Sequence, residues 1–355
     1  MKRMVLMTGL LAMAMMVSCG KDDPTPNQSA GGNGGGNTPQ VITGDGVYNP
    51  SAQILFSRDE LNGYSHQWVW TDGKLVSIAE DGQYGAQARE VVHFNYSNGR
   101  VSSIIFSDEQ LNGTLSLVYA NEYIQSFSLV YNGMTVVNAS VEHNSANKVS
   151  HVSATADASF IENLMQFLGN GFGDTILSEM LLSSSTHQSK MSFNSLTFDI
   201  DFVWNGNNVD YSVLSAECEI GFTLSELSEL VDLSSYLGSS DAVSLLMLMY
   251  GDTEIPITIG ICDTVEYTYD NHTNPLQGLM SQMTIATLSA NNTTEEYSHG
   301  SVIFSAQNPL TSSPISFDRP VPESTTTYTI QYNGNGLPIA VTDDTENTVE
   351  YEYKQ

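Results

Sequence analysis

The sequence predicts a mainly β protein: a curled antiparallel meander sheet of hairpin repeats, with short inserted helices packed on one face. Glycine-containing tight-turn motifs recur between stretches in which apolar residues alternate with polar ones, as expected for half-buried strands. The octapeptide at 56–63 (FSRDELNG) recurs fifty positions later at 106–113 (FSDEQLNG). Two segments, near 157–184 and near 223–250, instead place apolar residues at helical spacing.

The first 18 residues predict a lipoprotein signal peptide. Lys2 and Arg3 form a basic start, and residues 4–17 form an apolar run that is too short to span a bilayer, which takes about 20 residues. The run ends at Cys19 in a motif (MVSC) that resembles a bacterial lipobox, whose cysteine is acylated and becomes the mature N-terminus. The alternative is an ordinary signal peptide with an incidental cysteine.

Residues 19–42 are predicted to be an acylated N-terminus and a flexible tether. Lys21, Asp22 and Asp23 resemble the export signal of surface lipoproteins in Bacteroidota-type Gram-negative bacteria, which implies display on the cell surface. The following residues are mostly Gly, Asn, Pro, Ser and Thr, which cannot bury enough apolar surface to offset their ordering entropy. We therefore expect a protein held at the outer membrane, on the cell surface, by a fatty acyl chain such as palmitate.

Residues 43–355 are predicted to form a single β domain built from one recurring hairpin unit. An aromatic residue precedes a short polar turn, and alternating apolar positions follow, as at 70–78 (WTDGKLVSI) and 96–104 (YSNGRVSSI). Asp-Gly and Asn-Gly supply the positive backbone φ angles of a tight turn, and the flanking aromatic and β-branched residues suit strands. Weaker copies of the unit begin at Tyr119, His143, Trp204 and Tyr332.

These units resemble the YD repeats of the Rhs family, most clearly at 96–101 (YSNGRV) and 267–270 (YTYD). The ordered motifs at 204–209 (WNGNNV), 269–276 (YDNHTNPL) and 332–338 (YNGNGLP) more closely resemble Bacteroidota cell-surface lipoproteins built from such hairpins. The resemblance implies a curled β-sheet and assigns no catalytic residues. With only about six or seven units, we expect the sheet to curl without closing into the shell that Rhs proteins form.

Both helical segments have start or stop signals. Asp157 precedes an apolar stripe that stops at Gly169, and Thr223 and Glu226 have the spacing of a capping box. The stretch 241–250 is apolar almost all round, so a helix there must be covered on several sides. Either these helices plug the core, or they form a movable lid over a hydrophobic ligand cavity.

Composition excludes several classes of function. The 355 residues include 11 Lys and Arg against 40 Asp and Glu, giving a formal net charge of −29, which repels the phosphate backbone of nucleic acids. The sequence contains no nucleophile elbow, phosphate-binding loop, dinucleotide fingerprint or zinc-ligand cluster. We therefore predict that the protein is not an enzyme and has no cofactor and no metal.

Two pairs of side chains remain as candidates for chemistry. Asp199 and Asp201 share one strand face about 6.5–7 Å apart, which suits a cation, a glycosidase-like acid pair or simply a solvated face. Cys218 and Cys262 remain after acylation. They either form a disulfide, which would stabilise the fold by about 3–4 kcal/mol, or stay as two buried thiols.

Three tryptophans are candidates for ligand stacking. Trp68 and Trp70 share a strand face, and these two or Trp204 could stack on sugar rings, although all three also suit core packing. We therefore expect a non-catalytic binding or structural module for a glycan, a peptide or an outer-membrane protein partner, anchored to the membrane by lipid. The alternatives are a carrier of a hydrophobic ligand under a helical lid and a hydrolase that uses a paired carboxylate.

Overall fold

The computed structural model describes residues 52–59, 63–81, 89–107, 112–156, 192–223, 254–277, 288–307 and 314–354. The predicted signal peptide, Cys19, the tether and the two helical segments, except for Thr223, lie outside the described residues. Every regular element within the described ranges is a β-strand. The strands are β1 (Ile54–Asp59), β2 (Tyr64–Thr71), β3 (Lys74–Asp81), β4 (Arg89–Ser97), β5 (Arg100–Ser107), β6 (Asn112–Ala120), β7 (Tyr123–Tyr131), β8 (Met134–His143), β9 (Val149–Ala156), β10 (Ser192–Asn205), β11 (Asn208–Thr223), β12 (Glu254–Thr273), β13 (Asn291–Gln307), β14 (Pro314–Tyr332), β15 (Pro338–Asp343) and β16 (Thr348–Tyr353).

The sixteen strands form a closed antiparallel barrel in which each strand pairs with its neighbours in the sequence. The ring closes where β1 pairs with β16, from Ile54 opposite Tyr353 to Asp59 opposite Val349. The predicted antiparallel meander is therefore confirmed, but the expectation that the sheet stays open is wrong. Closure satisfies the backbone N–H and C=O groups that two free edge strands would expose.

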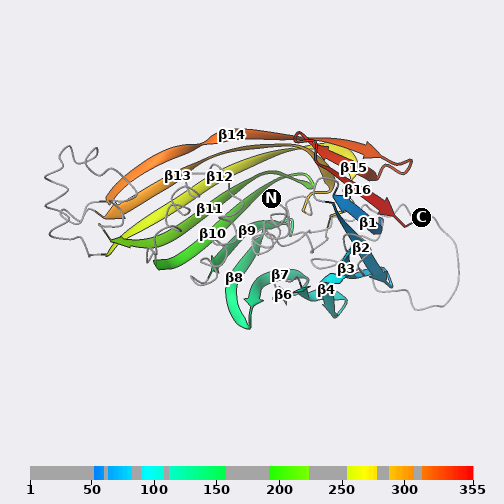
Figure 1. Cartoon of the computed structure of the whole chain (residues 1–355), viewed down its shortest axis with the longest axis horizontal. Coiled ribbons are helices and arrows are strands. Elements are labelled where there is room, and N and C mark those ends of the chain that lie inside the picture. Colours follow the sequence, from blue (N-terminus) through cyan, green and yellow to red (C-terminus); the bar gives the residue numbers. More distant parts are fainter. Residues whose placement is uncertain are drawn as a thin grey trace.

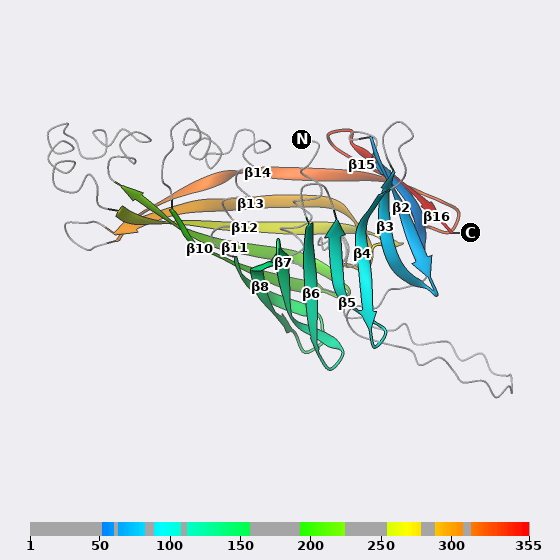
Figure 2. The ribbon, with the colours of Figure 1, turned by 60° about the horizontal axis from the view of Figure 1, so that its bottom comes forward.

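The barrel wall has two parts with strands of different length. Strands β10 to β14 contain 14 to 20 residues each, whereas β1 to β9 contain 6 to 10. The long strands arch over one side of the molecule, and the short strands form the other side (Figure 1). After rotation, β12 to β14 run horizontally while β4 to β6 run nearly upright (Figure 2), so the strands change direction strongly around the barrel.

The predicted hairpins are confirmed at each place where the sequence motif is clearest. The turn between β4 and β5 consists of Asn98 and Gly99, whose φ angles are +52° and +81°, as a two-residue type I′ loop requires. Asp72 and Gly73 form the same loop between β2 and β3. The weaker copies also lie at hairpin turns, which join β6 to β7, β8 to β9, β10 to β11 and β14 to β15.

Six aromatic side chains each donate a hydrogen bond to a backbone carbonyl of the preceding strand. The Tyr96 hydroxyl donates to the carbonyl of Leu75 at 2.7 Å, and the Tyr119 hydroxyl donates to the carbonyl of Val101 at 2.6 Å. The strand register shifts next to both tyrosines, as expected for a bulge that redirects a side chain. The same donation recurs from Trp204 to Val149, from Tyr269 to Val209, from Trp70 to Ile54 and from Tyr353 to Pro338.

The two faces of the wall differ in polarity. Alternate residues of the short strands are apolar and enclosed, and a closed barrel encloses only the side chains on its interior. The interior along the short strands is therefore apolar, unlike the water-filled lumen of a 16-strand porin. Its largest side chains, each less than 2% exposed, are those of Phe94, Phe106, Phe127, Ile54, Leu75, Ile104, Leu115, Ile124 and Leu129.

Candidate functional site

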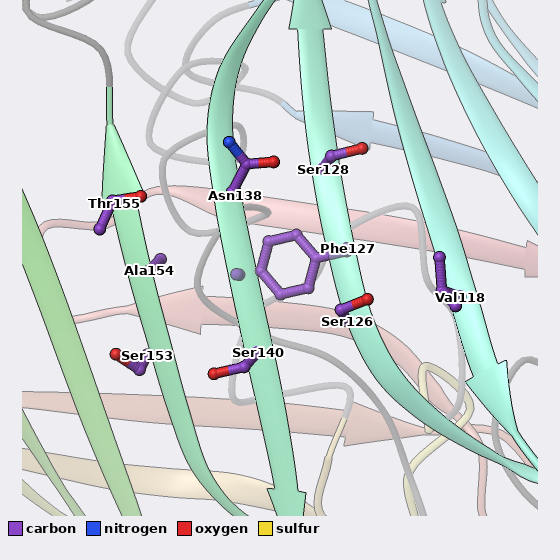
Figure 3. Close-up of a pocket in the computed structure, with 10 residues that line it drawn as sticks. Val118, Ser126, Phe127, Ser128, Asn138, Ser140, Ser153, Ala154 and Thr155 are labelled. Atoms are coloured by element: carbon purple, nitrogen blue, oxygen red, sulfur yellow. The ribbon is translucent and has the colours of Figure 1, made fainter.

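The exterior of β6 to β9 forms a shallow groove whose lining includes six small polar residues, together with Val118, Phe127, Ala139 and Ala154. Its volume is about 450 Å³, within the range of sites for small ligands. Neighbouring strands align these side chains in two rows, and Figure 3 shows the hydroxyl and amide groups of successive strands beside one another. The rows are Ser128–Asn138–Thr155, which Ser116 extends beyond the groove, and Val118–Ser126–Ser140–Ser153.

Strand alternation explains why this wall has a polar outside and an apolar inside. Phe127, Ala139 and Ala154 lie between the groove residues along β7, β8 and β9, and all three are buried in the interior core. Since successive side chains of a strand point to opposite faces, the serines next to them face outward. The groove is therefore a rigid sheet surface with the core directly behind it.

The predicted pair Asp199 and Asp201 lies beside this groove on the exterior of β10. Asp199 is opposite Ser153, the last residue of one groove row. The His151 ring lies between the two carboxylates: its Nε2 is 3.4 Å from Asp199 Oδ1 and its Nδ1 is 2.8 Å from Asp201 Oδ1. The prediction of a shared face is confirmed, but the carboxylates converge on a histidine at an open surface and not at the base of a cleft.

Sequence reasoning missed His151, because the seven histidines are scattered and none has metal-ligand spacing. His151 and Asp201 are 50 residues apart and become neighbours only through the pairing of β9 with β10. Predicting the contact would have required the register of β9 against β10. The sequence does not give that register, because residues 157–191 separate the two strands.

Of the two roles considered for the tryptophans, ligand stacking and core packing, the structure supports core packing. Trp68 is only 4% exposed, and its Nε1 donates to Ser57 Oγ at 3.0 Å within the interior. Trp70 and Trp204 pack partly buried against the same core, where each donates its N–H to a backbone carbonyl. The aromatic position of the repeat is thus used to join strands, which leaves these rings unsuited to stacking on a sugar.

Cys218 and Cys262 are both free, so the disulfide considered from the sequence is not formed. Cys218 is opposite buried Ile259, on the interior face, whereas Cys262 is opposite Ser215, on the exterior face. Burial, with a smaller contribution from Glu219, raises the pKa of the Cys218 thiol to about 11, which keeps it protonated at neutral pH.

The described residues hold no group of three or more His, Cys, Asp or Glu side chains arranged to bind a metal ion. No helix among them is long and apolar enough to cross a bilayer. No protein-family model matches the chain, and no curated protein matches it either. The geometry of the barrel exterior is therefore the basis for assigning a function.

Proposed function

We propose that this chain is a lipid-anchored protein of the outer-membrane surface that binds a neutral glycan without catalysing a reaction. The observation that supports this best is the exterior groove of hydroxyl and amide side chains on β6 to β9. The lipobox-like Cys19, the export signal and the resemblance to Bacteroidota surface lipoproteins supply the proposed location.

The polarity of the exterior favours a lipid anchor over insertion of the barrel itself. Sixteen antiparallel strands are consistent with an outer-membrane barrel, which has an even number of strands. Insertion, however, requires an apolar exterior band about 25 Å tall. Here Asp201, Glu217 and Glu266 are exposed on the exterior of three neighbouring strands. Acylation of Cys19 would hold the protein at the membrane while these carboxylates stay in water.

The chemistry of the groove suits a polyhydroxylated ligand. Serine hydroxyls and the Asn138 amide both donate and accept hydrogen bonds, and the Asp199 carboxylate at the edge accepts them from sugar hydroxyls. The net charge of −29 repels anionic ligands, which is why we expect the glycan to be neutral.

The anchor is tested by replacing its cysteine. In cells of a Bacteroidota host grown with an alkyne-labelled fatty acid, the wild-type chain should acquire the label and sediment with membranes. Cys19→Ser should lose both properties, whereas Cys262→Ser, which alters an exterior cysteine of the barrel, should keep them. Protease treatment of intact cells then reports surface display. Membrane-bound, labelled Cys19→Ser protein would contradict the anchor.

The groove is tested with an array of neutral and acidic oligosaccharides and the detergent-solubilised full chain. We expect binding to neutral glycans, weakened about tenfold or more by Asn138→Ala with Ser140→Ala, because each lost hydrogen bond contributes roughly 0.5–1.5 kcal/mol. Ser215→Ala is the matched control, since Ser215 is an exposed exterior serine in the same register row as Ser140. Absence of any glycan binding, or equal weakening by the control, would overturn this proposal.

The two alternative functions lack a comparable feature among the described residues. A hydrophobic carrier needs interior space, whereas the described interior of the short strands is filled with side chains less than 2% exposed. A paired-carboxylate hydrolase needs two carboxylates aimed at one bond, whereas Asp199 and Asp201 both face His151.

A further inference from the structure

Charge is distributed unevenly around the barrel. Strands β11, β12 and β13 contain no lysine or arginine, although they are among the longest strands of the wall. The short-strand side, by contrast, includes Arg58, Lys74, Arg89, Arg100 and Lys148. The acidic residues of β11 to β13 are Asp210, Glu217, Glu219, Glu254, Asp263, Glu266, Asp270, Glu295 and Glu296.

On the exterior of this acidic side, two tyrosines flank a glutamate. Tyr211 of β11 is opposite Glu266 of β12, which is opposite Tyr297 of β13. Neighbouring strands are about 4.8 Å apart, so the two tyrosine backbones stand roughly 10 Å apart with the carboxylate between them. Thr325 of β14 continues the row. Directly opposed residues point to one face, so both rings and the carboxylate project from the same surface.

A second carboxylate and a histidine complete this surface. Tyr297 is hydrogen-bonded to Glu323, and this bond is the largest of the effects that raise the pKa of the Tyr297 hydroxyl, with repulsion from the carboxylates of Glu323 and Glu266 adding to it. The His299 ring lies 5.4 Å from the Tyr297 ring, and its Nε2 is 3.6 Å from Glu266 Oε1. The Glu266 and His299 side chains are 59% and 42% exposed, so solvent reaches the surface.

We propose that this acidic tyrosine patch, formed by Tyr211, Glu266, Tyr297, His299 and Glu323, is a docking surface for an arginine-containing basic segment of a protein partner. Charge complementarity identifies the occupant, because β11 to β13 contain no lysine or arginine and their exposed carboxylates, with Glu323 of β14, attract cations and repel anionic lipids, phosphates and nucleic acids. Arginine fits better than lysine, since its planar guanidinium both pairs with carboxylates through two N–H groups and stacks on tyrosine rings.

This surface is separate from the glycan groove, which lies on β6 to β9. A partner can therefore dock on the long-strand side while the groove stays open. The proposal does not depend on glycan binding, and the two can fail independently.

The test is peptide binding to the detergent-solubilised full chain, measured by fluorescence anisotropy. The probe is a labelled peptide of alternating glycine and arginine, with its termini blocked, compared with lysine and serine analogues. We expect binding of the arginine peptide, weaker binding of the lysine peptide, none of the serine peptide, and a decrease as salt rises. Glu266→Gln with Glu323→Gln should weaken binding about tenfold or more, and Tyr297→Ala several-fold.

The matched control is Glu217→Gln with Glu219→Gln. It also removes two negative charges, but from positions on strand β11 outside the patch. We expect it to change affinity less than about twofold. Equal weakening by the control would show that the peptide is held only by diffuse electrostatic attraction. Equal affinity for the lysine and arginine peptides would show that stacking and paired hydrogen bonds do not contribute. Either result, or no binding at low salt, overturns the proposal. Asn138→Ala with Ser140→Ala, the groove variant, should leave peptide binding unchanged.

Discussion

Deletion of residues 347–355 should abolish the closed barrel. Those residues contain β16, which pairs with β15 on one side and with β1 on the other. Without β16, two strands become edges with unpaired backbone groups, and such edges pair readily with other chains. The deletion also removes Tyr351 and Tyr353, which pack against the core. We expect oligomers or aggregates on size-exclusion chromatography and loss of the cooperative unfolding transition.

The control for this deletion keeps the backbone and changes only exterior charge. Glu350 and Glu352 are exposed on β16, opposite Arg58 and Phe56 of β1. Glu350→Gln with Glu352→Gln should therefore leave the protein monomeric and change the free energy of unfolding by less than about 1 kcal/mol, because exposed ion pairs contribute little. A monomeric deletion variant that unfolds cooperatively would show that closure is dispensable.

Closure was the part of the fold that the sequence could not predict. Local chemistry specifies the hairpins: Asn98 and Gly99 allow only a narrow set of turns, and alternating apolar residues fix which face is buried. The pairing of β1 with β16 joins residues about 300 positions apart. No turn or periodicity links Ile54 to Tyr353. Counting repeat units therefore predicted an open, curled sheet in place of a closed barrel.

The candidate site was predictable to a similar degree. Alternation placed Asp199 and Asp201 on one face, and the structure agrees, but His151 reaches them only through tertiary pairing. Of the two roles considered for the tryptophans, core packing is the one that the structure supports, and the reason is physical. An aromatic ring that precedes a type I′ turn has its polar atom within reach of a backbone carbonyl on the neighbouring strand. The Trp70 Nε1–H, for example, donates to the carbonyl of Ile54. The same motif that identifies the hairpin therefore also buries the ring.

Phe127→Ala should cost about 3–5 kcal/mol of unfolding free energy, as expected for a buried phenylalanine. Phe127 is 2% exposed and lies between Leu117 of β6 and Ala139 of β8, which it directly opposes. Both neighbours are buried, so the surrounding wall can close over the cavity only partly. Equilibrium urea unfolding of the purified full chain, in a fixed detergent concentration, measures the change.

Val118→Ala is the comparison that decides which face of the wall is the core. Val118 is 53% exposed and lies one residue from Leu117, on the opposite face, so its truncation should change stability by less than about 0.5 kcal/mol. An inserted barrel has its apolar residues against lipid, and there truncation of Val118 would cost about 1–2 kcal/mol. A loss of that size at Val118, with little loss at Phe127, would contradict the assignment of the core to the interior face. Phe127 also lies directly behind the exterior groove of β6 to β9. Its truncation should loosen that surface as well, which is why exterior side chains such as Asn138 and Ser140 are the ones that test ligand binding.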